Sequence, residues 1–293
     1  MIITAQLVKE LRERTGAGMM ECKNALLETD GNIEIAIDNM RKSGMAKAAK
    51  KAGRVASEGR IEIKLSTDGL VAAILEVNSE TDFVAKDSNF KLFTQGVIDL
   101  VLASRVTEVE ALSNLELAEG QTVEQARQAL VSKLGENIQI RRAAILTSQG
   151  ALGSYTHSDR IGALVALSTP DQALAKDIAM HIAASNPQVL RPEDVSEHLV
   201  QQERDIFVAQ SAESGKPPEI IEKMVEGRIN KFKNEVALMG QSFVKDPNQT
   251  IAQLLASAKA NVTAFVRFEV GEGIEKQVED FAEAVMAQVS GGT

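Results

Sequence analysis

The stretch Ala73-Ile74-Leu75-Glu76-Val77 has a counterpart later in the chain, Ala163-Leu164-Val165-Ala166-Leu167. Both stretches are short, largely apolar and bounded by turn residues, which is typical of strands. Each is followed by a polar break and then by a segment with apolar residues at helical spacing. This local similarity predicts a diverged duplication in the core of the protein.

The predicted elements follow the same order around both stretches. The first set comprises strands over 60–65 and 70–77, helices over 90–102 and 123–134, and a strand over 138–146. The second set comprises strands over 152–156 and 161–167, helices over 174–184 and 251–256, and a strand over 262–270. Because Thr67-Asp68-Gly69 offers a turn, we expect a hairpin between the first two strands. The sequence therefore predicts an α+β fold with a duplicated core and antiparallel sheets.

Helical segments flank and interrupt this core. Before Met45, apolar residues recur at helical spacing in three short segments, and Thr4 is of the type favoured at a helix N-cap. The Ala-, Lys- and Gly-rich segment that follows predicts a solvated, partly helical linker. Spaced aliphatic residues on both sides of Gly215-Lys216-Pro217-Pro218 predict an antiparallel helical hairpin. Beyond Gly273, apolar residues again recur at helical spacing and predict an amphipathic helix.

The expected divisions follow from these changes in pattern. They are a three-helix domain over 1–44, a linker over 45–58, a first core half over 59–148, a second core half over 149–185 and 246–271, an inserted helical hairpin (coiled coil) over 186–245, and a C-terminal helical module over 272–293. The hairpin carries two apolar stripes, which motivates the hypothesis that it makes a peripheral partner contact or a self-association.

Composition limits the classes of function. The chain has 293 residues and a net charge of −9, so it is a poor general binder of phosphate backbones and nucleic acid is not the expected partner. The single Cys22 permits no internal disulfide, which fits a reducing compartment. No apolar segment reaches the length of a membrane span, and no basic region leads an apolar run at the N-terminus. We therefore expect a cytoplasmic protein without a membrane partner.

The sequence contains no recognisable catalytic, metal-binding or cofactor-binding motif. His157, His181 and His198 are scattered, and no two of them have the spacing of zinc ligands on one helix face. A phosphate-binding glycine loop is also absent, so we expect neither an enzyme nor a cofactor. His181 lies between apolar neighbours in a predicted helix, and Cys22 lies in a Met-containing helix, so we expect both to have structural roles.

One polar connection, from Asn78 to Asp87, carries a single aromatic residue, Phe83. We place it where the second strand has ended and the next helix has not begun. Two interpretations fit this pattern. Phe83 either folds back to cap the core between Val77 and Phe90, or it projects into a partner protein. The pattern alone leaves both open.

Several longer motifs resemble the bacterial elongation factor Ts family, whose members are guanine nucleotide exchange factors for the GTPase elongation factor Tu. The resemblance covers essentially the whole chain. It is carried by Leu11 to Lys23 (LRERTGAGMMECK), Thr81 to Lys86 (TDFVAK), Arg160 to Gly162 (RIG), Ile178 to Ala184 (IAMHIAA) and Arg267 to Gly273 (RFEVGEG). Together these motifs are far more specific than any single one.

The resemblance implies a fold and a set of contact residues. It implies a ubiquitin-associated-like three-helix domain, the two-part α+β core, the helical hairpin and the C-terminal module. It further implies that a segment enters the GTPase domain of elongation factor Tu, disrupts its Mg²⁺ and phosphate site and thereby promotes GDP release. That segment comprises Thr81, Asp82, Phe83 and Val84. The other implied partner contacts are Arg12, Met19, Met20 and His157. A homodimer or a 2:2 complex remains open.

A second hypothesis makes the chain an RNA-associated structural protein of the translation apparatus. A basic cluster in the predicted linker suggests it: Lys47, Lys50, Lys51 and Arg54. The cluster lacks interleaved aromatic residues for base stacking, and the chain as a whole is acidic. A steep salt dependence of binding to plain RNA would favour this hypothesis.

Overall fold

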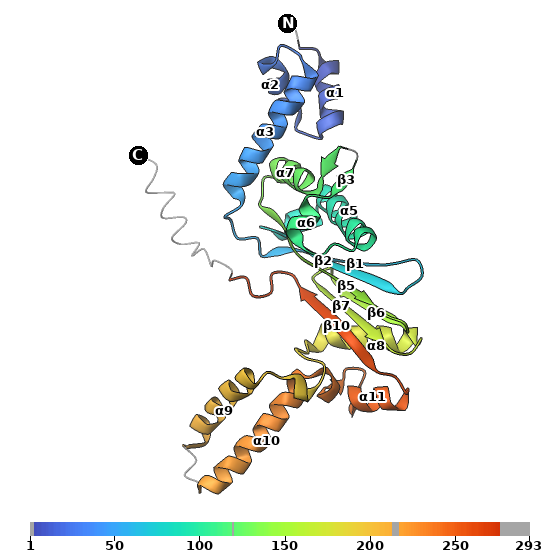
Figure 1. Ribbon diagram of the computed structural model, residues 1–293. Coiled ribbons are helices and arrows are strands. Elements are labelled where there is room, and N and C mark those ends of the chain that lie inside the picture. The colour runs from blue at the N-terminus through green and yellow to red at the C-terminus, as the bar shows by residue number, and fades with distance from the viewer. Residues whose placement is uncertain (1–2, 119, 213–216, 276–293) are drawn as a thin grey trace.

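Two three-stranded antiparallel sheets stack face to face at the centre of the computed structural model, which describes residues 3–118, 120–212 and 217–275 (Figure 1). The first sheet has the order β1-β2-β5, with β1 (Glu58–Leu65), β2 (Val71–Ser79) and β5 (Ile138–Thr147). The second has the order β10-β7-β6, with β6 (Leu152–His157), β7 (Ile161–Leu167) and β10 (Val262–Glu269). In each sheet, the strand that comes second in the sequence lies in the middle, and the strand that comes last in the sequence pairs with it. The predicted strands and their repeated order are therefore present.

The middle strands, β2 and β7, are largely apolar because both of their faces are buried. On β2, Ala72 and Ile74 face the second sheet, whereas alternate residues such as Leu75 contact the helices of the first core half. On β7, Leu164 faces the first sheet and Val165 faces helices of its own half. The two sheets that contain these strands are thus the inner layers of a helix–sheet–sheet–helix arrangement.

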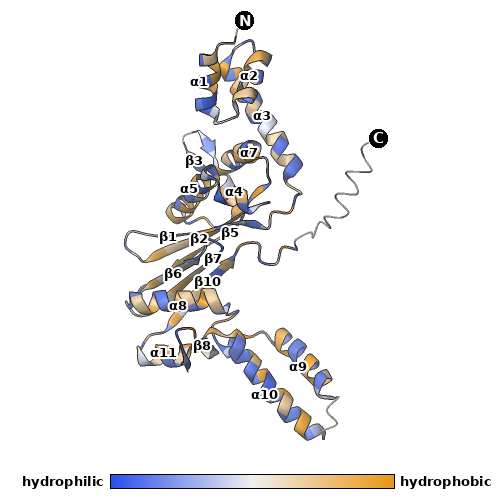
Figure 2. Ribbon diagram, turned by 180° about the vertical axis from the view of Figure 1, so that it is seen from behind, coloured by the Kyte–Doolittle hydropathy of each residue, from blue (hydrophilic) through white to orange (hydrophobic). Residues whose placement is uncertain are grey.

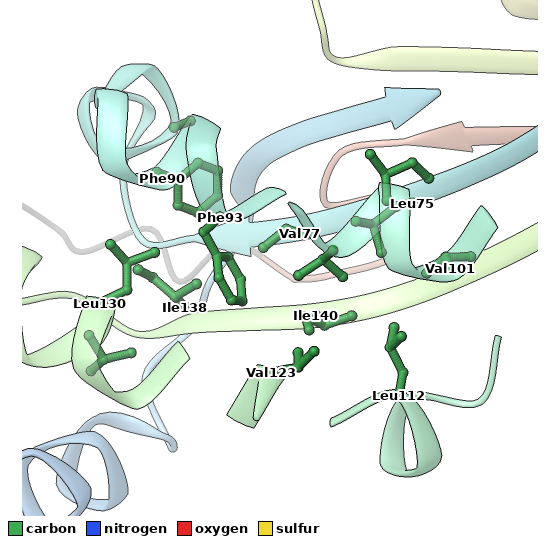
Figure 3. Packing of buried hydrophobic residues seen from close by; sticks show 14 of the residues in the cluster. Leu75, Val77, Phe90, Phe93, Val101, Leu112, Val123, Leu130, Ile138 and Ile140 are labelled. Carbon is green, nitrogen blue, oxygen red and sulfur yellow. The ribbon is translucent and has the colours of Figure 1, made fainter. Parts of the chain in front are cut away.

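Helices cover the outer faces of the two sheets. In the first half, α5 (Ser88–Ser104) and α7 (Val123–Leu134) enclose a core that includes Phe90 and Leu75 (Figure 3). In the second half, α8 (Gln172–Ser185) covers β6 and β7, and α11 (Ile251–Ser257) contributes Ile251 and Leu255 to the same core. These four helices lie within two residues of the bounds predicted from periodicity.

Several shorter elements lack a sequence signal long enough to be predicted. They are α4 (Asp82–Lys86), α6 (Val109–Ser113), β3 (Glu116–Ala118), β4 (Gln121–Thr122), the 3-10 helices Pro192–Asp194 and Leu238–Gly240, β8 (Ser242–Phe243) and β9 (Asp246–Thr250). Phe243 and Leu238 are buried in the core of the second half. The last residues assigned to the inserted segment therefore pack with that core.

Three N-terminal helices lie at one end of the molecule (Figure 1). They are α1 (Ala5–Thr15), α2 (Met19–Glu28) and α3 (Ile33–Lys51). The first helix is capped by Thr4, as expected, and Cys22 is buried among the three helices. The boundary expected at residue 44 falls inside the third helix, which continues to Lys51 and so includes part of the segment expected to be a partly helical linker. Ala48 in this part is buried in the core of the first half, so the segment is not solvated throughout.

The helical hairpin lies at the opposite end (Figure 1). Its arms are α9 (Glu197–Ala212) and α10 (Pro218–Val236), and hydrophobic and hydrophilic residues alternate along α10 (Figure 2). Gly215 and Lys216 of the predicted turn lie outside the described residues, as does nearly all of the predicted C-terminal helix. In the described ranges, no helix combines the length and the apolar character needed to cross a bilayer.

A buried carboxylate connects three parts of the core. Glu76 lies in the middle of β2 with no exposed surface. Its Oε1 accepts hydrogen bonds from Arg141 Nη1 at 3.0 Å and from the backbone N–H of Gly271 at 2.8 Å, and its Oε2 accepts one from Arg142 Nε at 2.6 Å. A β-bulge at this point of the β2–β5 pair lets two consecutive arginines reach the same carboxylate.

Removing this charge should destabilise the fold. The substitution Glu76→Gln leaves two guanidinium groups without their buried counter-charge, so we expect the free energy of unfolding to fall by about 3 kcal/mol. Urea denaturation measures the change, and Glu110→Gln, on the exposed surface of α6, is the matched control. Equal unfolding midpoints for the two variants would show that the Glu76 charge contributes nothing.

His181 joins α8 to the segment that follows the hairpin. It is fully buried, its Nδ1 accepts a hydrogen bond from the backbone N–H of Val244 at 3.3 Å, and its Nε2 lies 3.0 Å from Gln241 Oε1. A backbone N–H can only donate, so the neutral ring must carry its proton on Nε2. Burial lowers the pKa of His181 below its ordinary value of 6.5, and the bond to Gln241 offsets part of this effect. The structure thus gives His181 the expected structural role.

This lowered pKa predicts a loss of stability in mild acid. Below pH 6.5, the unfolded chain takes up a proton that the buried ring resists, so each further pH unit costs up to about 1.4 kcal/mol until the folded pKa is reached. We expect His181→Gln to reduce this slope in urea denaturation between about pH 6.5 and 5, relative to the parent chain. The control His198→Gln, at an exposed position of α9, should keep the parent slope. If His181→Gln kept the pH dependence of stability of the parent chain, the lowered pKa of His181 would not be the cause of that dependence.

Candidate functional site

Phe83 is the most exposed large apolar residue among the described residues, with 81% of its surface accessible. Its exposure excludes the interpretation that Phe83 caps the core, because a side chain in that role would be buried. The expectation of a non-helical connection was wrong in its local detail. Phe83 lies in α4, a helix of five residues between the end of β2 and α5.

The helix α4 is anchored by the residues around Phe83. Val84 and Ala85 are each 8% exposed and pack into the core of the first half. Thr81 is the N-cap, and its Oγ1 accepts a hydrogen bond from the backbone N–H of Val84 at 3.4 Å. Asp87 ends α4 and caps α5 through the backbone N–H of Asn89 at 2.7 Å. The backbone that carries Phe83 is therefore attached at both ends.

Thr81 has a second set of contacts that sequence reasoning missed. The carboxylate of Glu136, in the turn between α7 and β5, accepts hydrogen bonds from the Thr81 backbone N–H at 2.9 Å and from the Thr81 hydroxyl at 2.6 Å. The two residues are 55 positions apart, so no local pattern connects them. The pairing of β2 with β5, which the sequence pattern did not predict, brings these segments together.

Asp82 lies beside Phe83 and carries a negative charge. Lys86 Nζ donates a hydrogen bond to Asp82 Oδ2 at 2.6 Å, one helical turn away. This bond is the main reason that the pKa of Asp82 lies below its ordinary value, and the charge of Arg160 adds to the effect. The exposed tip of α4 therefore combines an aromatic ring with an ionised carboxylate.

The predicted contact residues of the N-terminal helices are all at the surface. Arg12 is exposed on α1, and Met19 and Met20, at the start of α2, are 60% and 65% exposed. Two contacts fasten these helices to the core near α4. Lys51 Nζ donates to the carbonyl of Gly135, and Asn137 Nδ2 donates to the carbonyl of Arg54 at 2.7 Å. The turn that holds Thr81 therefore also holds the end of α3.

His157 is exposed at the tip of the β6–β7 hairpin. Its Nδ1 lies 3.5 Å from the hydroxyl of Tyr155, and the two rings stack with their centroids 6.5 Å apart. The tip is bound to β1, because Arg160 pairs with Glu58, which is itself paired with Ser79 at the end of β2. The structure thus places His157 at the end of the sheets from which α4 begins.

The basic cluster of the RNA hypothesis is largely paired within the protein. Lys47 forms an ion pair with Glu21 at 2.7 Å, and Arg54 forms one with Glu80 at 3.5 Å. Lys51 donates to the Gly135 carbonyl, as described above. Three of the four positive groups therefore have internal partners, which disfavours a basic arm that binds phosphate.

The two core halves approach closely at a position within one of the resemblance motifs. A Cβ atom at Gly162 would lie 2.5 Å from Ile61 Cγ2 of the facing sheet. Only glycine lets the sheets approach to this distance. The motif Arg160-Ile161-Gly162 therefore combines an ion pair at the hairpin tip with a close contact between the sheets.

Comparisons with known proteins agree with this arrangement. The family described as "Elongation factor TS" matches residues 80–272, a range that includes α4, the helices and last strand of the first core half, the whole second half and the hairpin. "Elongation factor Ts" of Legionella pneumophila (strain Lens) is 57% identical over 287 residues, which cover 98% of each chain. "Elongation factor Ts" of Thioalkalivibrio sulfidiphilus is 57% identical over 293 residues, covering 99% of this chain and 100% of the relative. On this evidence, the chain belongs to the elongation factor Ts family.

Proposed function

We propose that this chain promotes release of GDP from elongation factor Tu by inserting Phe83 and Asp82 beside the Mg²⁺ and phosphate site of that GTPase. The observation that carries the proposal is the exposed ring of Phe83 on a helix that is anchored in the core. A large apolar side chain in this position gains free energy only when a partner covers it. Family membership gives the partner, since the relatives are named as elongation factors Ts.

Packing energy is sufficient for this activity. A GTPase holds GDP through backbone amides around the phosphates and through Mg²⁺, which requires near-ideal octahedral geometry. Burial of a Phe side chain provides about 1.5–3 kcal/mol, and it can stabilise an arrangement of the partner in which that geometry is lost. Each ~1.4 kcal/mol of coupling weakens nucleotide binding about tenfold. Asp82 would add a negative charge near the groups that bind Mg²⁺.

The same coupling returns the exchange factor to solution. If the bound chain weakens the affinity of the GTPase for nucleotide, then bound nucleotide must weaken its affinity for the chain by an equal factor. Incoming GTP therefore displaces the chain, and the GTPase is reloaded for translation elongation. The cycle needs no covalent step, so the chain acts as an exchange factor and not as an enzyme in the covalent sense.

The other exposed residues of the site provide affinity in this proposal. Arg12, Met19 and Met20 form a second contact on the three-helix unit, and His157 forms a third on the β6–β7 hairpin. Contacts that are equally strong with and without nucleotide tighten the complex but do not release GDP. The division of roles predicts different kinetic effects for substitutions at Phe83 and at the methionines.

Replacing Phe83 should lower the maximal exchange rate. We expect Phe83→Ala to reduce the rate of fluorescent GDP release from elongation factor Tu, at saturating exchange factor, by about tenfold or more, because the apolar free energy of the ring is lost. The control Leu70→Ala removes another exposed apolar side chain at the opposite end of β2 and should leave the rate unchanged. An unchanged rate for Phe83→Ala in a folded variant would refute the proposed insertion.

Replacing the methionines should instead weaken the complex. For the double substitution Met19→Ala and Met20→Ala, we expect the half-saturating concentration of exchange factor to rise about tenfold while the maximal release rate stays near the parent value. Met45→Ala, at a half-exposed position of α3, is the control. A fall in the maximal rate without a change in half-saturation would contradict the assigned role.

A further inference from the structure

We propose that Glu136 is the positioning residue of α4 and that its carboxylate holds the helix in the orientation from which Phe83 projects. This inference rests on the proposed function for its kinetic consequence, but its structural part can be tested without any partner. The carboxylate uses one oxygen for the Thr81 backbone N–H, at 2.9 Å, and the other for the Thr81 hydroxyl, at 2.6 Å. It therefore fixes both the backbone and the side chain of the residue that starts the helix.

The helix needs such support because it is too short to be stable alone. A single helical turn costs more conformational entropy than its one or two internal hydrogen bonds return, so isolated helices of this length do not persist in water. On the buried side, α4 is held by the small side chains of Val84 and Ala85. Its N-cap bond from Val84 to Thr81 is long, at 3.4 Å. The contact with Glu136 is the shortest of the bonds that fix Thr81.

Every polar group of Thr81 is used in this arrangement. Besides the two bonds to Glu136, the Thr81 carbonyl accepts a hydrogen bond from the hydroxyl of Ser79 at 2.9 Å. It also accepts the first helical bond, from the backbone N–H of Ala85 at 3.4 Å. Loss of the Glu136 carboxylate removes the partners of two donors at once, whereas loss of any other single contact removes one.

Residues 80–81 also fix the turn that contains Glu136. Glu80 Oε1 accepts a hydrogen bond from the backbone N–H of Asn137 at 2.6 Å, so 80–81 and 136–137 exchange carboxylate-to-backbone bonds in both directions. Asn137 is 1% exposed, and its Nδ2 donates to the carbonyl of Arg54 at 2.7 Å. The position of α4 and the attachment of the N-terminal helices therefore depend on the same turn.

Charge makes this contact stronger than an ordinary N-cap. Hydrogen bonds to an ionised carboxylate are roughly twice as strong as neutral ones, and two on one residue also fix its orientation. We therefore expect Glu136→Ala to lower the maximal rate of GDP release about tenfold, although Glu136 itself is only half-exposed and lies outside the Phe83 tip. The effect should act through Phe83 and not through a new contact with the partner.

Hydrogen exchange in the free chain tests whether Glu136 holds α4 in place. In Glu136→Ala, we expect the backbone amides of 80–87 to exchange about tenfold faster or more, while amides in α8 keep their parent rates. The matched control is Glu124→Ala on α7. Glu124 has a partly exposed carboxylate bonded to Arg127 at 2.6 and 2.7 Å and makes no contact with Thr81, so its loss should leave 80–87 protected. Unchanged exchange in Glu136→Ala would overturn the proposal.

Kinetic double-substitution cycles test whether the effect passes through Phe83. Glu136→Ala should slow maximal GDP release from elongation factor Tu about tenfold in the parent chain and should have no further effect in a chain that already carries Phe83→Ala. Glu136→Gln, which keeps one acceptor oxygen without the charge, should retain an intermediate rate. Thr81→Ser, which keeps both donors, should retain the parent rate, and Thr81→Val, which lacks the hydroxyl, should not.

The outcomes separate this inference from the proposed function. Additive effects of Glu136→Ala and Phe83→Ala, or a parent rate in Glu136→Ala despite faster hydrogen exchange, would overturn the role of Glu136. A parent rate in Phe83→Ala would overturn the proposed function, and hydrogen exchange alone would then decide whether Glu136 positions α4. Urea denaturation of Glu136→Ala, Phe83→Ala and Thr81→Val checks that the measured chains are folded.

Discussion

Burial of β2 and β7 on both faces is the constraint on which the remaining structure depends. Each strand contributes alternate side chains to the contact between the two sheets and to the core of its own half. The chain must therefore supply helices on both outer faces and a partner sheet on the inner face. Glu76 is the single charged residue within these two strands, and it is accommodated by two arginines and a backbone N–H. The repeated order of elements supplies these layers once in each half.

The candidate site lies at one end of this framework, where segments far apart in sequence meet. The end of β2, the α7–β5 turn, the β6–β7 hairpin and the last turn of α3 all reach this region. An exposed aromatic ring can be kept outside the core here because its neighbours are fixed by the core and by charged hydrogen bonds. The ring therefore keeps most of its apolar surface exposed, and the proposed function assigns that surface to a partner.

The sequence predicts the elements that depend on long periodic patterns and misses those that depend on contacts. All six long strands and the helices α5, α7, α8 and α11 follow from local spacing of apolar residues. The burial of Ala48 in the last part of α3 was missed, because alanine carries too little apolar surface to signal burial in a distant core. Helix α4 was missed because five residues provide no periodicity. Glu136 was missed because its partner, Thr81, is 55 residues away. An aromatic residue in a polar connection made Phe83 a candidate contact residue. Only its exposure in the folded chain shows that it does not cap the core.

The central claim is that contact with this chain lowers the affinity of elongation factor Tu for GDP through packing free energy. The most direct measurement is the dissociation constant of GDP from elongation factor Tu, determined by calorimetry with no exchange factor and with a saturating concentration of this chain. The account predicts an increase of about tenfold or more when the chain is bound, with an equal decrease in the affinity of the chain for the GTPase when GDP is bound. An unchanged dissociation constant for GDP would contradict it.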